Sequence, residues 1–89
     1  MNSEFRIEFG SQATRDLRRL QRADRKLVIS LAKCIDSLTE DPYSGKPLKG
    51  DKKGCYSLRY GDYRIIYEIH SAPKVVHVIR IGHRKEIYR

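Results

Sequence analysis

The sequence predicts a two-layer α+β domain in which a helical hairpin packs on a small antiparallel sheet, in the order β-α-α-β-β-β. An alternating apolar pattern opens the chain, two stretches with apolar residues at helical spacing follow, and the second half is rich in aromatic and β-branched residues. A helical hairpin can cover one face of such a sheet and leave the other face open. All 89 residues are expected to form this single domain.

The first half of the chain predicts one strand followed by two helices. Residues 5–9 alternate apolar and charged side chains, which is typical of a half-buried strand with its apolar residues inward. Ser11 and Asp24 are each expected to cap a helix. Asp41-Pro42 is expected to end the second helix, because the residue before a proline avoids helical backbone angles. The apolar helix positions are Ala13, Leu17, Leu20, Leu27, Leu31, Cys34, Ile35 and Leu38.

The second half predicts a basic loop followed by three strands. Residues 42–54 are expected to form the loop, since they hold two prolines, three glycines and four lysines. Three stretches rich in aromatic and β-branched residues are predicted strands: Tyr56–Tyr60, Tyr63–Ile69 and Val75–Ile81. The pair Gly61-Asp62, which alone separates the first two, is typical of a tight hairpin turn.

The chain has a net charge of +8, and almost all of it lies in the second half. Residues 45–89 hold 11 Lys or Arg against four Asp or Glu, a net charge of +7. A concentrated basic surface attracts phosphate backbones or acidic surfaces. No stretch approaches the roughly 18 apolar residues of a membrane span, and the N-terminus lacks the pattern of a secretory signal. We therefore expect a cytoplasmic protein with no membrane partner.

The sequence patterns of metal and nucleotide sites are absent. Cys34 and Cys55 lack C-x-x-C spacing, and no carboxylates in the basic half have metal-ligand spacing. His70 and His77 are predicted to be structural, and no glycine motif for cradling phosphates occurs. Neither a metal nor a cofactor is expected. Phosphoryl chemistry would therefore use the 2′-hydroxyl of RNA itself, with cationic side chains stabilising the transition state.

The tight turn predicts an arginine pair on the open face of the sheet. A two-residue loop fixes the register of its strands, so Arg59 is expected to lie opposite Arg64. Like charges directly opposed across two strands destabilise a sheet. Two guanidinium groups placed in this way favour an anion between them, and their geometry suits phosphate.

The second hairpin is expected to extend this pair into a row. If residues 70–74 form its loop, Ile69 pairs with Val75 and Arg64 faces Arg80. The same register predicts an exposed apolar patch made up of Ile66, Val76 and Val78. Such a patch beside basic residues indicates a protein partner as well as an anion. RNA phosphates are expected to bind to Lys46, Lys49, Lys52, Lys53 and Arg80.

The C-terminal tail adds further candidates for chemistry. His83 follows a glycine at the end of the last strand, where an imidazole could transfer a proton near neutral pH. Arg84 adds a positive charge next to it. Tyr88 could donate a hydrogen bond or stack on a base.

Three segments together resemble the RelE/ParE toxin superfamily, and more closely its RelE branch: residues 46–50, 55–69 and 81–89. The resemblance covers the whole chain. It implies a RelE-like fold and a toxin of a type II toxin–antitoxin pair. RelE-like members enter the ribosomal A site and cleave the translated mRNA there, which would make the chain a metal-independent endoribonuclease, or mRNA interferase, that inhibits translation and growth.

The resemblance also implies roles for individual residues. Arg59 matches a basic strand residue, Arg64 the phosphate-stabilising arginine, Arg84 a second arginine and Tyr88 a terminal tyrosine. Ser57 stands where the best-known members have a lysine implicated in proton transfer. The residues that could take over the role of general base are Lys49, Lys52, Lys53 and His83.

The family implies three kinds of partner. The cognate antitoxin would be an acidic, partly disordered, RelB-like protein that wraps the toxin with a helix, and the basic charge of this chain suits it. The ribosome and its mRNA would be the target. Operator DNA would be bound through the toxin–antitoxin complex.

Two other functions remain open. A ParE-like toxin of the same fold would inhibit DNA gyrase and cut nothing. A catalytically weak family member would act mainly with its antitoxin as an operator-binding repressor, and the serine at position 57 keeps that reading open. The arginine pair and the C-terminal tail favour the nuclease, because an inhibitor that only binds protein does not need converging phosphate ligands.

Overall fold

The computed structural model describes residues 4–87 and confirms the α+β class and the predicted element order. Among these residues no helix is long and apolar enough to cross a membrane. Two short 3₁₀ turns, η1 (Pro42–Ser44) and η2 (Gly50–Lys52), flank a short strand that falls within the predicted loop. The helices and strands are β1 (Arg6–Phe9), α1 (Ser11–Ala23), α2 (Arg25–Ser37), β2 (Lys46–Pro47), β3 (Cys55–Tyr60), β4 (Tyr63–His70), β5 (Val75–His83) and α3 (Arg84–Ile87).

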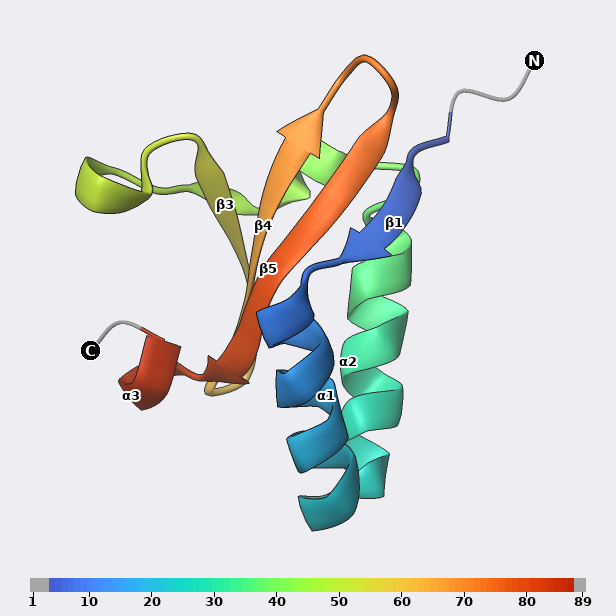
Figure 1. Cartoon of the computed structure of the whole chain (residues 1–89), viewed down its shortest axis with the longest axis vertical. Helices are drawn as coiled ribbons and strands as arrows, with labels where there is room; N and C mark the ends of the chain where they lie inside the picture. The colour runs from blue at the N-terminus through green and yellow to red at the C-terminus, as the bar shows by residue number, and fades with distance from the viewer. Residues whose placement is uncertain (1–3, 88–89) are drawn as a thin grey trace.

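The sheet has the strand order β1-β5-β4-β3-β2 and is mixed (Figure 1). β2, β3, β4 and β5 pair antiparallel, whereas β1 runs parallel to β5. The expectation of a purely antiparallel sheet is therefore wrong at this edge. Parallel neighbours need a long crossover, and the helices together with β2, β3 and β4 provide it.

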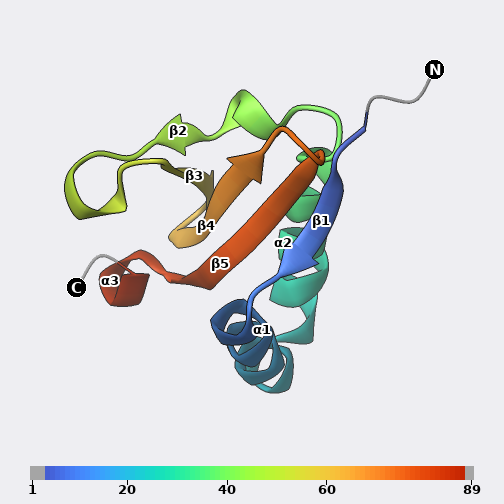
Figure 2. The ribbon, with the colours of Figure 1, turned by 45° about the horizontal axis from the view of Figure 1, so that its top comes forward.

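Helices α1 and α2 lie side by side on one side of the sheet (Figure 2). The Asp24 side chain accepts a hydrogen bond from the Leu27 backbone N–H and caps α2, as predicted. Ser11 is instead the first residue of α1, whose cap position is Gly10. The buried core between helices and sheet consists of Ala13, Leu20, Leu31, Ile35, Leu38, Ile65, Tyr67, Val76, Val78 and Ile81.

The β3–β4 hairpin has the predicted register. Tyr60 lies opposite Tyr63, and Arg59 lies opposite Arg64. Gly61 has a φ of 58°, a left-handed conformation that a tight two-residue turn requires and that glycine adopts without steric cost. The hairpin could be predicted because its geometry depends on two adjacent residues alone.

The β4–β5 hairpin differs from the predicted register. His70, not Ile69, lies opposite Val75, so the loop is one residue shorter than expected. A bulge on β5 shifts the pairing again, which puts Arg80 opposite Ile66. The predicted row of three arginines is therefore wrong.

The same shift removes the predicted apolar patch. Val76 and Val78 are fully buried in the core because they lie opposite Ile69 and Tyr67 on the helix-facing side. Ile66 points to the other side but is only 3% exposed. The prediction of an exposed patch at these three positions is wrong.

Tyr67 fixes the segment that leads into β2. Its hydroxyl is fully buried, donates to the Pro42 carbonyl at 2.7 Å and accepts from the Gly45 backbone N–H at 3.1 Å. A Cβ atom at position 45 would collide with this hydroxyl, so glycine permits the close approach. By holding Gly45, Tyr67 also positions the next residue, Lys46, at the edge of the sheet.

Tyr67 also predicts how stability depends on pH. Burial, opposed in part by the hydrogen bond from Gly45, raises the pKa of Tyr67 to about 12, above the value of about 10 in an unfolded chain. The folded state therefore binds the proton more tightly, and the resulting stabilisation is present below pH 10 and is lost as the pH rises towards 12. Between pH 10 and 12 we therefore expect the free energy of unfolding of the wild type to fall more steeply than that of Tyr67→Phe. The difference in slope should be about 1 kcal/mol per pH unit.

Urea unfolding of both proteins at a series of alkaline pH values measures this difference. The exposed Tyr43 supplies the control, since Tyr43→Phe should follow the wild type. At neutral pH, Tyr67→Phe should be less stable by about 2 kcal/mol, because two buried backbone groups lose their partner. Parallel curves for wild type and Tyr67→Phe above pH 10 would contradict the prediction.

Candidate functional site

The arginine pair lies on the open face, next to the Gly61-Asp62 turn. Arg59 is exposed, and its side chain makes no hydrogen bond or ion pair within residues 4–87. Arg64 is half-buried, and its Nη1 donates to the carbonyl oxygens of Gly61 at 3.1 Å and Tyr63 at 3.0 Å. These bonds fix the Arg64 guanidinium and leave its Nε and Nη2 donors available for an anion.

Helix α3 brings Arg84 to the same end of the sheet. The Arg84 backbone N–H donates to the Asp62 carbonyl at 2.8 Å, and its Nε lies 3.9 Å from the Asp62 carboxylate. Both side chains are more than half exposed, so this ion pair contributes little stability and leaves the guanidinium accessible. The turn between β3 and β4 thus holds Arg84 near the arginine pair.

Gly82 lies opposite Arg64 and makes room for α3. A Cβ atom at position 82 would come within 3.3 Å of the Ile87 side chain. Ile87 is buried, so α3 packs onto the sheet beside Arg64 and covers part of the face that was expected to be open.

His83 lies at this end of β5 but on the other side of the sheet. It faces Tyr63 across the strands, with ring centroids 5.5 Å apart, and Tyr63 packs against the core. The His83 Nδ1 accepts a hydrogen bond from the Lys85 backbone N–H at 3.2 Å. His83 therefore lies near the arginine pair along the strands but does not share its face, and its role in proton transfer stays a prediction.

Lys46 is the lysine that pairing places nearest the arginine pair. β2 aligns Lys46 directly with Ser57, and Ser57 lies two residues from Arg59 on the same face of β3. Directly opposed Cβ atoms lie about 5 Å apart, so the Lys46 stem begins beside the small Ser57 side chain. The Lys46 side chain is exposed, with no ion pair to any described residue.

The other basic-loop lysines lie further away. Lys49, Lys52 and Lys53 are exposed and precede β3, at the end of that strand opposite the Gly61-Asp62 turn (Figure 1). Three strand residues separate Cys55 from Arg59, and the four steps between them span about 13 Å, so these lysines do not converge with the arginine pair. Their contact with RNA phosphates stays a prediction. Tyr88, the predicted terminal tyrosine, lies outside the described residues.

Arg80 has a partner within the protein. Its Nε donates to the Asp16 carboxylate at 3.1 Å, and the same oxygen accepts from the Ile81 backbone N–H at 2.9 Å. Asp16 is only 1% exposed and also accepts from Gln12 Nε2 at 3.0 Å. β1 ends opposite Val78, so this carboxylate on α1 satisfies the backbone of β5 where strand pairing stops.

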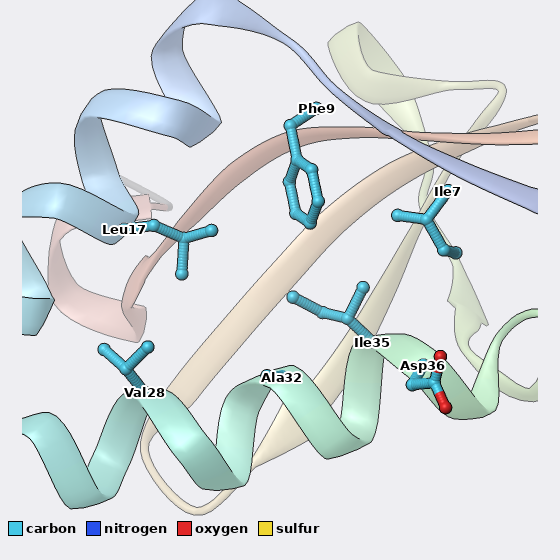
Figure 3. A pocket seen from close by; sticks show the side chains of 7 residues that line it. All are labelled: Ile7, Phe9, Leu17, Val28, Ala32, Ile35 and Asp36. Carbon is cyan, nitrogen blue, oxygen red and sulfur yellow. The ribbon is translucent and has the colours of Figure 1, made fainter.

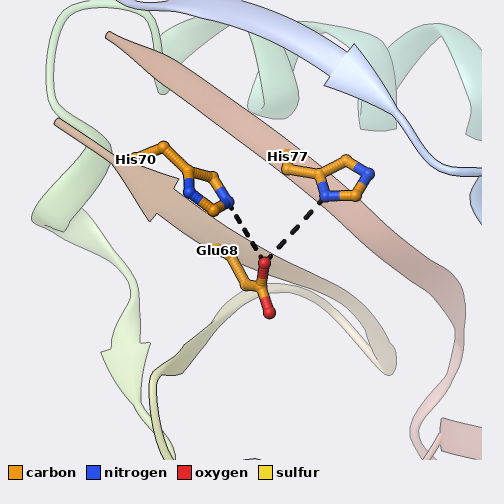
Figure 4. Close-up of side chains that lie close together, drawn as sticks. All are labelled: Glu68, His70 and His77. Carbon is orange, nitrogen blue, oxygen red and sulfur yellow. Dashed lines mark hydrogen bonds and ion pairs between the residues drawn. The ribbon is translucent and has the colours of Figure 1, made fainter. Parts of the chain in front are cut away.

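Sequence reasoning missed one group of side chains, which comprises Glu68, His70 and His77 (Figure 4). The signal was present in part, because Glu68 and His70 are two residues apart on one strand and so share a face. The contribution of His77 could not be predicted without the β4–β5 register. Cys55 lies opposite Glu68, and burial followed by the charge of Glu68 raises the pKa of its thiol, which disfavours the reactive thiolate.

An exposed apolar surface occurs where the two helices meet β1. An apolar hollow of about 210 Å³ lies between β1 and the two helices, and Phe9, Leu17 and Val28 point into it (Figure 3). Phe9 is 44% exposed, although the alternating pattern of the first strand predicts that it faces inward. The basic residues Arg18 and Arg22 line the adjoining surface of α1.

The sequence and the fold match a known family. The model of the ParE toxin of the type II toxin–antitoxin system parDE matches residues 7–88. The chain belongs to the RelE/ParE toxin superfamily. Toxin RelG of Mycobacterium tuberculosis is 34% identical over 86 residues, which span 96% of this toxin and 97% of RelG.

Solved structures of toxin–antitoxin complexes show the same fold. The toxin–antitoxin complex RelBE2 from Mycobacterium tuberculosis contains a chain that matches with a TM-score of 0.82 and 29% identity over 91% of this toxin and 99% of that chain. The intact RelBE complex from E. coli matches with a TM-score of 0.75 and 25% identity over 89% of this toxin and 95% of that chain. These matches confirm the RelE-like fold and a toxin of a type II toxin–antitoxin system.

Proposed function

We propose that this toxin is a ribosome-dependent mRNA endonuclease that cuts translated mRNA in the ribosomal A site. The observation that carries the proposal is the cross-strand pair of Arg59 and Arg64, with Arg84 held at the same end of the sheet. Charges of one sign that the fold holds together at a solvent-facing site stabilise an anion. An RNA phosphate gains negative charge in the transition state of cleavage, so such a site favours the reaction.

In this proposal the RNA supplies its own nucleophile. The 2′-hydroxyl oxygen attacks the adjacent phosphorus, the bond to the 5′-oxygen of the next nucleotide breaks, and a 2′,3′-cyclic phosphate forms. A base takes the proton from the 2′-hydroxyl, and an acid protonates the departing 5′-oxygen. Arg64 would stabilise the phosphorane with its Nε and Nη2 donors, while Arg59 and Arg84 would hold the neighbouring phosphates.

We propose Lys46 for the proton transfer that the lysine of related toxins performs. Ser57 occupies the position of that lysine, and Lys46 begins beside it on the adjacent strand. A lysine stem is long enough to bring its Nζ over Ser57 and towards Arg59. The buried Tyr67 hydroxyl holds this strand in place through Gly45. The neighbouring strand would thus supply the ammonium group that β3 lacks.

Replacing Lys46 with alanine should lower the rate of mRNA cleavage by about 10²- to 10⁴-fold, which is the usual contribution of general acid–base catalysis. The measurement is single-turnover cleavage on programmed ribosomes, followed across pH. Lys49→Ala serves as the matched control and should retain cleavage within a few-fold, because Lys49 lies at the far end of β3. Equal losses in both variants would show that Lys46 contributes only general RNA binding.

A cell-free translation system tests the proposed function as a whole. Purified toxin is added to a translated mRNA, and primer extension maps the ends of the products. The proposal requires new mRNA ends at a fixed position within codons. These ends should be absent when translation is blocked upstream of the cleavage positions. Intact mRNA with normal translation would refute it.

A ParE-like activity is the second candidate, because the matching family model describes the toxin of the parDE system. Such a toxin would inhibit DNA gyrase and leave mRNA intact. A gyrase supercoiling assay with purified toxin distinguishes the two. Inhibited supercoiling together with uncut mRNA would establish the second function, whereas a toxin inactive in both assays would indicate a catalytically weak member that serves a repressor complex.

We propose an acidic antitoxin as the protein partner. The similar structures RelBE2 and RelBE are toxin–antitoxin complexes, and the net charge of +8 suits an acidic protein. The apolar hollow at Phe9 and Leu17, with Arg18 and Arg22 beside it, fits an amphipathic segment that carries acidic residues. Operator DNA would be bound through this complex, and the site of action would be the cytoplasm, where ribosomes translate.

A further inference from the structure

Three potential metal ligands gather on the open sheet face, far from the arginine pair. Glu68 and His70 lie on β4, and His77 lies on β5 (Figure 4). The Glu68 Oε1 is 3.2 Å from His70 Nε2 and 4.0 Å from His77 Nδ1. One ligand atom from each of the three side chains lies within 4.8 Å of the other two.

The strand register produces this cluster. Glu68 and His70 are two residues apart on β4 and therefore point to the same side of the sheet. His77 lies directly opposite Glu68 on β5, so its ring comes from the neighbouring strand towards the same carboxylate. The cluster thus depends on the paired part of the sheet and not on a mobile loop.

We propose that Glu68, His70 and His77 form a binding site for a divalent transition-metal ion of the Zn²⁺ class. Two imidazole nitrogens and one carboxylate oxygen are a donor set that such ions prefer. At metal–ligand distances of about 2.1 Å, tetrahedral ligands lie about 3.4 Å apart. The Glu68–His70 separation of 3.2 Å is already close to that spacing, and the Glu68–His77 separation of 4.0 Å needs to shorten by about 0.6 Å. Side-chain rotation provides an adjustment of this size.

The ring nitrogens already point in the required direction. In the absence of metal, the His70 Nε2 is within hydrogen-bond distance of Glu68 Oε1 at 3.2 Å, and the His77 Nδ1 lies 4.0 Å from the same oxygen. A change of tautomer turns each of these nitrogens into a lone-pair donor for a metal. The strand register thus brings two imidazole nitrogens towards one carboxylate oxygen, which is the arrangement that a shared cation would use.

The site is open to incoming ions. The side chains of Glu68, His70 and His77 are 40%, 51% and 39% exposed. A shallow hollow of about 290 Å³ adjoins both histidines and is also lined by Glu8, which lies opposite His77 on β1. The Glu8 carboxylate is paired with Arg6 at 3.0 Å, so water is the natural fourth ligand.

The proposed metal site is separate from the proposed cleavage site. Three strand residues lie between Arg64 and Glu68, and the four steps along β4 span about 13 Å. A bound ion would link β4 to β5 next to their connecting turn and stabilise that end of the hairpin. The proposal therefore stands or falls independently of RNA cleavage.

Calorimetric titration of the full, tag-free chain with Zn²⁺ tests the proposal. We expect one Zn²⁺ per chain, and Co²⁺ in its place should give the visible absorption of a four-coordinate site. His77→Ala, His70→Ala and Glu68→Gln should each weaken binding by about tenfold or more. Zn²⁺ should raise the thermal midpoint of the wild type and not that of His77→Ala.

His83→Ala is the matched control, since His83 is the remaining histidine and lies at the other end of β5. It should bind Zn²⁺ as the wild type does. No saturable binding by the wild type, or equal losses in His83→Ala and His77→Ala, would overturn the proposal. The exposed His70 provides a second variant should His77→Ala fail to fold, as judged by circular dichroism without metal.

Discussion

Replacing Arg64 with alanine is expected to slow mRNA cleavage by about 10²- to 10³-fold while leaving the fold intact. This reduction in rate is typical of removing one fixed hydrogen-bond donor that stabilises the negative charge developing in the transition state. The fold should persist because the Arg64 side chain donates only to the carbonyl groups of Gly61 and Tyr63 beside the turn, where water can replace it. Primer extension over a time course of cell-free translation measures the rate, and far-ultraviolet circular dichroism checks the fold.

Arg25→Ala provides the matched control, because it removes the same charge from an exposed position at the start of α2. It should cleave within a few-fold of the wild-type rate. Arg64→Lys should recover part of the lost activity, since it restores the charge without the fork of donors. Wild-type cleavage by Arg64→Ala would remove the arginine pair from the proposed site.

Replacing Asp16 with alanine is expected to lower the free energy of unfolding by about 3 kcal/mol. The carboxylate is 1% exposed and accepts from Arg80, Ile81 and Gln12. Its removal leaves the Ile81 backbone N–H without a partner and breaks the ion pair with Arg80. Urea unfolding at neutral pH measures the difference.

Asp36→Ala controls for the loss of a carboxylate, because Asp36 lies exposed on α2. A change of about 0.5 kcal/mol or less is expected there. Asp16→Asn should fall between the two, since an amide oxygen can still accept from Ile81 but carries no charge. Similar midpoints for Asp16→Ala and Asp36→Ala would mean that water replaces the carboxylate at the edge of β5.

Features that depend on neighbouring residues could be predicted from the sequence. The register of Arg59 against Arg64 followed from a two-residue turn, and Asp24 was identifiable as a cap from the apolar positions after it. The helical hairpin followed from apolar spacing in the same way. Each of these signals is complete within a short stretch of chain.

Features that depend on distant residues could not be predicted. The parallel pairing of β1 with β5 joins residues from the two ends of the chain, and neither strand encodes its partner. The bulge opposite Ile66 and Tyr67 contains no glycine or proline that would indicate it in the sequence. Because of this bulge, Arg80, which the sequence predicts as a phosphate ligand, lies opposite Ile66 and pairs with Asp16.

The residues of the candidate site likewise differ in whether neighbouring or distant parts of the chain position them. Arg59, Arg64 and Arg84 were predicted together and do lie at one end of the sheet, since a hairpin and the strand that follows it bring them there. Lys46 was predicted as a phosphate ligand, but its alignment with Ser57 required a strand of two residues inside a predicted loop. A two-residue strand is too short to produce a recognisable periodic pattern.

The pairing of β1 with β5 also bears on when this toxin becomes active during its own synthesis. β1 is made first and β5 nearly last, and closing so long a chain segment is entropically costly until both strands exist. The contact that holds Arg84 beside the β3–β4 turn likewise needs residues at the end of the chain. A growing chain on the ribosome therefore lacks both the complete sheet and the assembled arginine end until β5 and Arg84 have been made.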